Sequence, residues 1–94
     1  MKTLKQVDII PIYVKEIPSR EDMKFGEFYI CLQYFATNHL CLCGCGHQCY
    51  LPINKDGWRI GDTKENKLTI TPSILQRFEC KSHYIITNNI ANFV

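Results

Sequence analysis

The stretch that decides the fold is "HLCLCGCGHQC", residues 39–49, which holds four of the six cysteines and two of the three histidines of the chain. Cys41, Cys43 and Cys45 occupy every second position, and disulfides between residues two apart are strained. Thiolates that bind one metal ion meet no such restriction, and the glycines between them let the backbone curl around an ion. In a reducing compartment, clustered cysteines indicate a metal site or catalysis. We therefore predict bound zinc, with a secreted disulfide scaffold as the alternative.

A fourth zinc ligand is offered by "CKSH", residues 80–83. If residues 80–86 are extended, Cys80 and His83 face opposite sides of the strand, and zinc takes Cys80 beside the three clustered thiols. If "CKSH" is instead a tight turn, His83 can bind the metal and one thiol of the first cluster becomes redundant. The set of Cys41, Cys43, Cys45 and Cys80 uses every clustered thiol and is preferred, with His83 as the alternative ligand.

The remaining cysteines and one histidine have simpler interpretations. Cys31 and Cys49 lie in strand-like runs, where a free cysteine usually packs as a small apolar side chain. His47 lies between Gly46 and Gln48, which is typical of a solvated loop. We expect none of the three to bind the metal.

Length, charge and hydropathy restrict the class of protein. With 94 residues, the chain is predicted to form one zinc-binding β domain over residues 1–94. Its net charge of +2, without a basic tract, argues against nucleic-acid binding. The N-terminal segment lacks the apolar core of a signal peptide, and no run approaches the roughly 20 apolar residues of a membrane span. We expect a cytoplasmic protein that has neither nucleic acid nor membrane as a partner.

The residue pattern predicts an all-β fold of six to eight short strands, held together by a structural zinc. Apolar, β-branched or alternating runs indicate strands at residues 7–14, 26–35, 48–53, 58–62 and 67–74. A tight turn is predicted at residues 54–57, and a hairpin is predicted around Asn88 and Asn89. One helical turn is expected over residues 72–78, because Pro72 suits a first helical position and Ile74 and Phe78 are four residues apart.

Three motifs in order give the chain a family resemblance. "HLCLCGCG", "TPSI" and "CKSHY" resemble the H-x-C-x-C-G-C-G, S/T-P-S-I and C-x-S-H-[YFW] motifs of a small bacterial family formerly of unknown function. The resemblance covers about residues 26–89. The chain departs from the family pattern at Leu42, where proline is frequent, and at "LQRF" after Ile74, where Gly-Asn is frequent.

The resemblance implies a cellular context. Members of this family occur in operons that encode ubiquitin-like proteins with their activating and conjugating enzymes, and some of these operons are tied to antiviral defence. The family context implies a role in processing or deconjugating a ubiquitin-like protein, or in binding its conjugation enzymes.

If four thiols take the zinc, four residues of the motifs have no role in metal binding, namely Ser82, His39, Ser73 and His83. A serine beside a histidine can perform acyl transfer, because the imidazole removes the hydroxyl proton and later protonates the leaving amine. Neighbours on a strand point apart, which argues against Ser82 with His83. The plausible pairs are Ser73 with His83, and Ser82 with His39.

The same residues also have structural interpretations. Ser73 can cap a turn, and His39 and His83 can donate hydrogen bonds to the cysteine sulfurs. No orienting third group is evident, and Asn38 and Asp62 are candidates by position alone.

Two functions are therefore carried forward. The first is a zinc-stabilised serine-type peptidase that acts on the C-terminal tail of a ubiquitin-like protein. The alternative is a non-enzymatic zinc-binding interaction module of the same system. A catalytic zinc with His83 as ligand ranks lower, because no glutamate lies near the ligands to act as a base.

Overall fold

The computed structural model describes residues 6–61, 67–76 and 79–94. These residues form nine strands and two short 3-10 turns, and no α-helix occurs among them, which confirms the all-β prediction. The strands are β1 (Gln6–Asp8), β2 (Ile10–Tyr13), β3 (Glu27–Cys31), β4 (Ala36–Leu40), β5 (Gln48–Pro52), β6 (Arg59–Ile60), β7 (Ile70–Leu75), β8 (His83–Thr87) and β9 (Ile90–Phe93), and the 3-10 turns are η1 (Arg20–Asp22) and η2 (Leu32–Tyr34).

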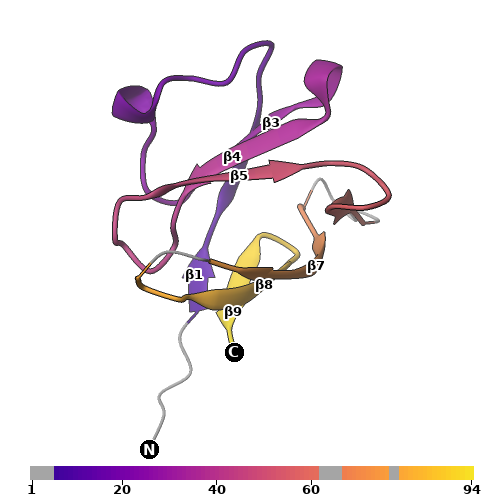
Figure 1. Cartoon of the computed structure of the whole chain (residues 1–94). Coiled ribbons are helices and arrows are strands. Elements are labelled where there is room, and N and C mark those ends of the chain that lie inside the picture. The colour runs from indigo at the N-terminus through magenta and orange to yellow at the C-terminus, as the bar shows by residue number, and fades with distance from the viewer. Residues whose placement is uncertain (1–5, 62–66, 77–78) are drawn as a thin grey trace, which may run out of the picture.

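The strands form two sheets that share one apolar core (Figure 1). One sheet has the order β1-β9-β8-β7-β6 and the other the order β2-β3-β4-β5. All neighbours are antiparallel except β2 and β3. The core contains Phe28 and Ile30 from the smaller sheet and Ile74, Tyr84 and Ile86 from the larger, each at most 1% exposed. Side chains from both sheets therefore support the segments that carry the site.

The strand predicted over residues 7–14 is divided between the sheets. β1 pairs with β9 in one sheet and β2 pairs with β3 in the other. Between them, the buried Ile9 donates its backbone N–H to the carbonyl of Asn89. Pro11 lies on β2, at an edge of its sheet, where its missing N–H removes no ladder bond. This division is one reason why the strand count exceeds the predicted six to eight.

The second reason is β4, which residue patterning did not indicate. Thr37, Asn38 and His39 are all buried, at most 6% exposed, although each is polar. A strand that is buried on both faces loses the alternation of apolar and polar residues on which the prediction of the neighbouring strands depended.

The helical turn predicted over residues 72–78 is wrong within the described residues. β7 continues through Pro72 to Leu75 and pairs with β8. A spacing of four residues places side chains on one face of a helix and also on one face of a strand, so it could not distinguish the two. Phe78, which belonged to that spacing, lies outside the described residues.

The C-terminal hairpin is confirmed. Asn88 and Asn89 form the two-residue turn between β8 and β9, with φ values of 50° and 66°. Two consecutive positive φ values match the turn geometry that joins twisted antiparallel strands, and asparagine tolerates it. Across the described part of the chain, no helix is long and apolar enough to cross a membrane.

Candidate functional site

The four predicted thiols lie together at one end of the two sheets. Cys41, Cys43 and Cys45 are in the loop between β4 and β5, and Cys80 is in the turn before β8. Their sulfur atoms lie within 4.8 Å of one another. The Cys41 Sγ is 3.5 Å from that of Cys43 and 3.8 Å from that of Cys80, and the Cys45 and Cys80 sulfurs are 3.7 Å apart. In Figure 1 these two loops meet beside the sheets.

The sulfur separations fit a tetrahedral metal ion. Four thiolates at the usual zinc–sulfur distance of about 2.3 Å are about 3.8 Å from one another. The observed separations bracket that value, and sulfur is a donor that zinc accepts readily. The cluster could therefore hold a metal ion.

The loop that carries three of the thiols is shaped by its glycines. Gly44 and Gly46 have φ values of +93° and +86°, which side chains other than glycine rarely adopt. The loop closes through the Cys41 N–H, which donates to the carbonyl of His47 at 2.8 Å. Arg20 Nε donates to the Gly46 carbonyl at 3.0 Å and holds the loop from outside.

The four thiols differ in their electrostatic environment. Burial raises the pKa of Cys41, because it disfavours the charged thiolate. Hydrogen bonds from the side chain and backbone of Ser82 lower the pKa of Cys80 to about 6. Burial raises the pKa of Cys43, but hydrogen bonds from Ser82 and from neighbouring thiols give a net lowering. The Ser82 side chain is thus committed to the sulfur cluster.

The cysteines and the histidine predicted not to bind the metal lie outside this set. Cys31 and Cys49 are buried and are not part of the four-sulfur group. His47 is exposed, as expected, but its Nδ1 lies 3.2 Å from the Cys45 sulfur. It therefore contacts the cluster from its solvent side, a contact that sequence reasoning missed.

Ser73 and His83 form a hydrogen-bonded pair beside the cluster. His83 Nε2 lies 2.7 Å from Ser73 Oγ, and both side chains are half-buried. Strand pairing places the two residues on one face: His83 lies opposite Leu75, and Ser73, two residues from Leu75 on β7, is diagonal to His83. A bulge in β7 adjoins this contact, because three residues of β7 oppose one residue of β8 between the pairs Ile70–Ile86 and Ile74–Tyr84. Bulges redirect side chains and are frequent next to active sites.

This geometry is that of a nucleophile with its general base. An imidazole within hydrogen-bond reach of a serine hydroxyl can accept its proton during attack on a carbonyl. Among the described residues, no carboxylate is hydrogen-bonded to His83. Within that part of the chain, the site is therefore a serine–histidine pair and has no third, orienting residue. Asn38, one predicted orienting group, accepts a hydrogen bond from Gln48 instead, at 2.8 Å. Asp62, the other, lies outside the described residues.

The second predicted pair is not formed, because His39 has a different partner. His39 is fully buried on β4, stacks on Phe28 with ring centroids 4.5 Å apart, and its Nε2 lies 2.7 Å from the hydroxyl of Tyr84. Tyr84 also accepts a hydrogen bond of 2.8 Å from Gln76 Nε2. Burial lowers the pKa of His39 to about 3, so the imidazole is neutral. Ser82, its predicted partner, faces the sulfur cluster.

Tyr84 is the site residue that sequence reasoning missed. It follows His83 on β8, so its side chain points to the opposite face and into the core. A buried tyrosine hydroxyl needs a hydrogen-bond partner. Because side chains alternate along β8, Tyr84 faces the core when His83 faces the other side. Its buried hydroxyl would therefore have indicated a polar partner across the core, such as His39.

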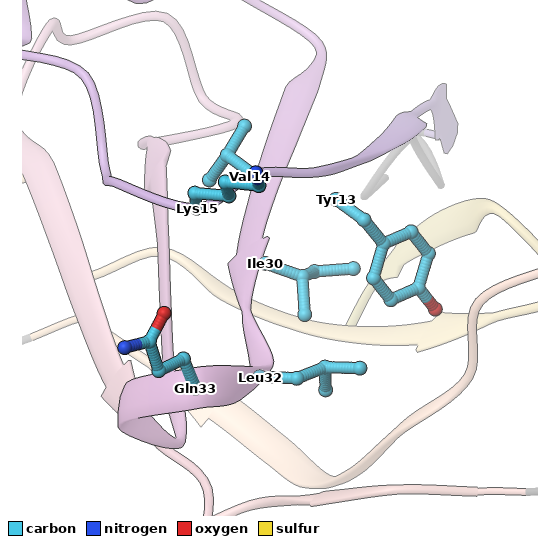
Figure 2. A pocket seen from close by; sticks show the side chains of 6 residues that line it. All are labelled: Tyr13, Val14, Lys15, Ile30, Leu32 and Gln33. Atoms are coloured by element: carbon cyan, nitrogen blue, oxygen red, sulfur yellow. The ribbon is translucent and has the colours of Figure 1, made fainter.

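A separate apolar hollow lies at the other end of the smaller sheet (Figure 2). It has a volume of about 300 Å³ and is lined by Tyr13, Val14, Lys15, Ile30, Leu32 and Gln33. None of the predicted site residues lines it, and it contains no serine, histidine or cysteine. This hollow is therefore separate from the cluster and from the Ser73–His83 pair.

Comparison with known proteins identifies a family for this chain. The family model of the bacterial ubiquitination-like system serine protease (BubE) matches residues 13–94, which include all four clustered cysteines and both residues of the pair. No curated protein and no solved structure matches the chain. The match covers most of the sequence, and the chain belongs to the bacterial ubiquitination-like system serine protease family.

Proposed function

We propose that this protein is a serine peptidase in which Ser73 is the nucleophile and His83 the general base. The observation that carries the proposal is the contact of 2.7 Å between Ser73 Oγ and His83 Nε2. As Oγ attacks the substrate carbonyl, Nε2 takes its proton, and it then gives this proton to the leaving group. Water hydrolyses the resulting acyl-enzyme with His83 as base again.

The substrate we propose is a ubiquitin-like protein, cleaved at its C-terminal tail during processing or deconjugation. The support comes from the family, which is named for a ubiquitination-like system. The enzymes that conjugate the same ubiquitin-like protein are the other proposed partners.

The metal we propose is a structural Zn²⁺ held by Cys41, Cys43, Cys45 and Cys80. Four protein thiolates fill a tetrahedral site, which is the composition of structural zinc centres. His83 contacts Ser73 and lies outside the four-sulfur group, which supports separate roles for the metal and the catalytic pair. Bound zinc would hold the loop before β8 and so fix the strand that begins at His83.

The test is cleavage of the ubiquitin-like precursor by the zinc-loaded protein. We expect Ser73→Ala and His83→Ala each to abolish cleavage while zinc content and the thermal transition persist. Ser82→Ala, which removes a neighbouring serine of the cluster, is the matched control and should still cleave. A fluorophosphonate probe should label Ser73. Undiminished cleavage by Ser73→Ala would overturn the proposal.

The alternative, a non-enzymatic interaction module, is supported by an exposed aromatic surface. Tyr34, Phe35 and Tyr50 are 65%, 66% and 59% exposed and line a pocket of about 440 Å³. Exposed aromatic patches are typical of protein interfaces. This alternative predicts that a complex with the ubiquitin-like protein forms without cleavage and survives both Ser73→Ala and His83→Ala.

A further inference from the structure

The edge of β7 that points away from β8 carries no paired strand beyond Thr71 in the described part of the chain. β6 pairs only with the first two residues of β7, and no other strand in the described part of the chain pairs with this edge. On the β8 side, the Gln76 N–H donates to the carbonyl of Ser82. Because backbone groups alternate along a strand, the N–H and C=O of Leu75 point away from β8. The protein thus presents unpaired backbone groups two residues from Ser73.

A pocket of about 230 Å³ opens beside this edge, between β7 and β5, which is an edge strand of the other sheet. Its walls include Tyr50 and Leu51 from β5, Ile74, Leu75 and Gln76 from the β7 side, and Trp58. No charged side chain of the described residues lines it. Trp58 Nε1 donates to the Ser73 carbonyl at 3.4 Å, so the pocket adjoins the hydroxyl-bearing residue itself.

On the basis of the proposed function, we infer that the substrate binds as an added strand on the open edge of β7 and inserts one uncharged side chain into this pocket. Backbone hydrogen bonds to Leu75 would align an extended segment along Ser73, as in other cases of strand addition. Alternate side chains of an added strand point to one face, so one of them enters the pocket while its neighbours face solvent. A charged side chain there would lose its hydration without finding a partner.

The test uses Trp58, the single tryptophan of the chain, as the reporter. Zinc-loaded Ser73→Ala protein is titrated with capped octapeptides. Each position of the peptide is varied in turn, and it carries leucine, phenylalanine or aspartate. We expect leucine or phenylalanine at one position to change Trp58 fluorescence and to bind about tenfold or more tightly than aspartate at that position. Equal binding of aspartate and leucine at every position would overturn the pocket.

The strand geometry is tested by N-methylation of the tightest peptide. Removing single N–H groups should weaken binding about fivefold at every second residue and leave the residues between nearly unaffected. In the protein, Leu75→Pro removes one edge N–H and should weaken binding relative to Leu75→Ala, which keeps it. A uniform effect of N-methylation, or none, overturns strand addition even if Leu75→Pro fails to fold.

Failure of this inference is distinguishable from failure of the proposed function. Hydrolysis of 4-nitrophenyl acetate by the unsubstituted protein, lost in Ser73→Ala, tests the catalytic pair without a peptide. Retained ester hydrolysis without alternating N-methyl effects overturns only the binding mode. Alternating effects without Ser73-dependent hydrolysis support the groove and count against the peptidase.

Discussion

The four-cysteine cluster and the Ser73–His83 pair are neighbours, yet they are built in opposite ways. The cluster takes its four thiols from two loops. It depends on residue type, because its chemistry requires a cysteine at each of the four positions. The pair lies on two adjacent strands and depends on their register, which places Ser73 diagonal to His83, because serine and histidine occur in many places without touching. Under the proposed function, the cluster would determine whether this chain folds, whereas the pair would determine what the folded chain can do.

The largest effect should come from breaking the cluster. Cys80→Ser, or removal of metal with a chelator, should abolish the cooperative thermal transition, because a structural zinc contributes about 10–16 kcal/mol of apparent binding energy to folding. Cys49→Ala is the matched control, since Cys49 is a cysteine outside the cluster, and it should keep one zinc per chain. Metal analysis and calorimetry measure both. A Cys80→Ser protein as stable as Cys49→Ala would refute the structural role.

Breaking the pair should leave the fold intact and remove activity. Ser73→Ala and His83→Ala should each lower kcat/KM by about 10³-fold or more, and the double variant should be no worse than either, because the two residues act as a unit. Losses that add in the double variant would show that Ser73 and His83 act independently. Zinc content is the control that separates this outcome from a cluster defect.

A smaller effect is expected from Tyr84→Phe, which leaves both regions in place but removes the hydroxyl between His39 and Gln76. Leaving these buried groups without a partner should lower the free energy of unfolding by about 1–3 kcal/mol. Tyr50→Phe is the matched control, because Tyr50 is 59% exposed, and its change should stay within about 0.5 kcal/mol. Denaturant melts of the zinc-loaded proteins measure the difference, and equal midpoints would contradict a stabilising role for the Tyr84 hydroxyl.

The smallest effect should come from Ser82→Ala, the residue that joins the two regions. Its side chain hydrogen-bonds to the sulfurs of Cys43 and Cys80, and the next residue is His83. Loss of such a supporting hydrogen bond should weaken zinc affinity about tenfold, which is about 1.4 kcal/mol. Competition with a chromogenic chelator measures this change. Ser19→Ala is the control, since the Ser19 hydroxyl contacts Asp22.

Sequence reasoning reached the cluster more fully than the pair. The cysteine pattern favoured Cys41, Cys43, Cys45 and Cys80 as one set, with His83 as the alternative ligand, and the structure brings these four sulfurs together. For the serines and histidines, two pairings stayed open, because the choice depends on which strands pair with each other, and side-chain patterns do not reveal this.

The strands also differ in how well their residue pattern predicted them. Those with one solvent face, such as β5, were predicted from their apolar and polar residues. β4 was not predicted, because its polar residues are buried. The helical turn at Pro72 failed because a spacing of four fits both secondary structures. Sequence patterns therefore indicated the parts of the fold in which a single face or a single residue type dominates.

The position of Cys80, three residues before His83, has a consequence for strand alignment. Successive residues of β8 face opposite sides, so slippage by one position would bury the imidazole and turn Tyr84 outward. A metal ion bound to Cys80 would anchor the start of this strand, and slippage would then break the coordination by Cys80. The ion would then fix the register of β8 against β7, so that His83 stays within hydrogen-bond distance of Ser73.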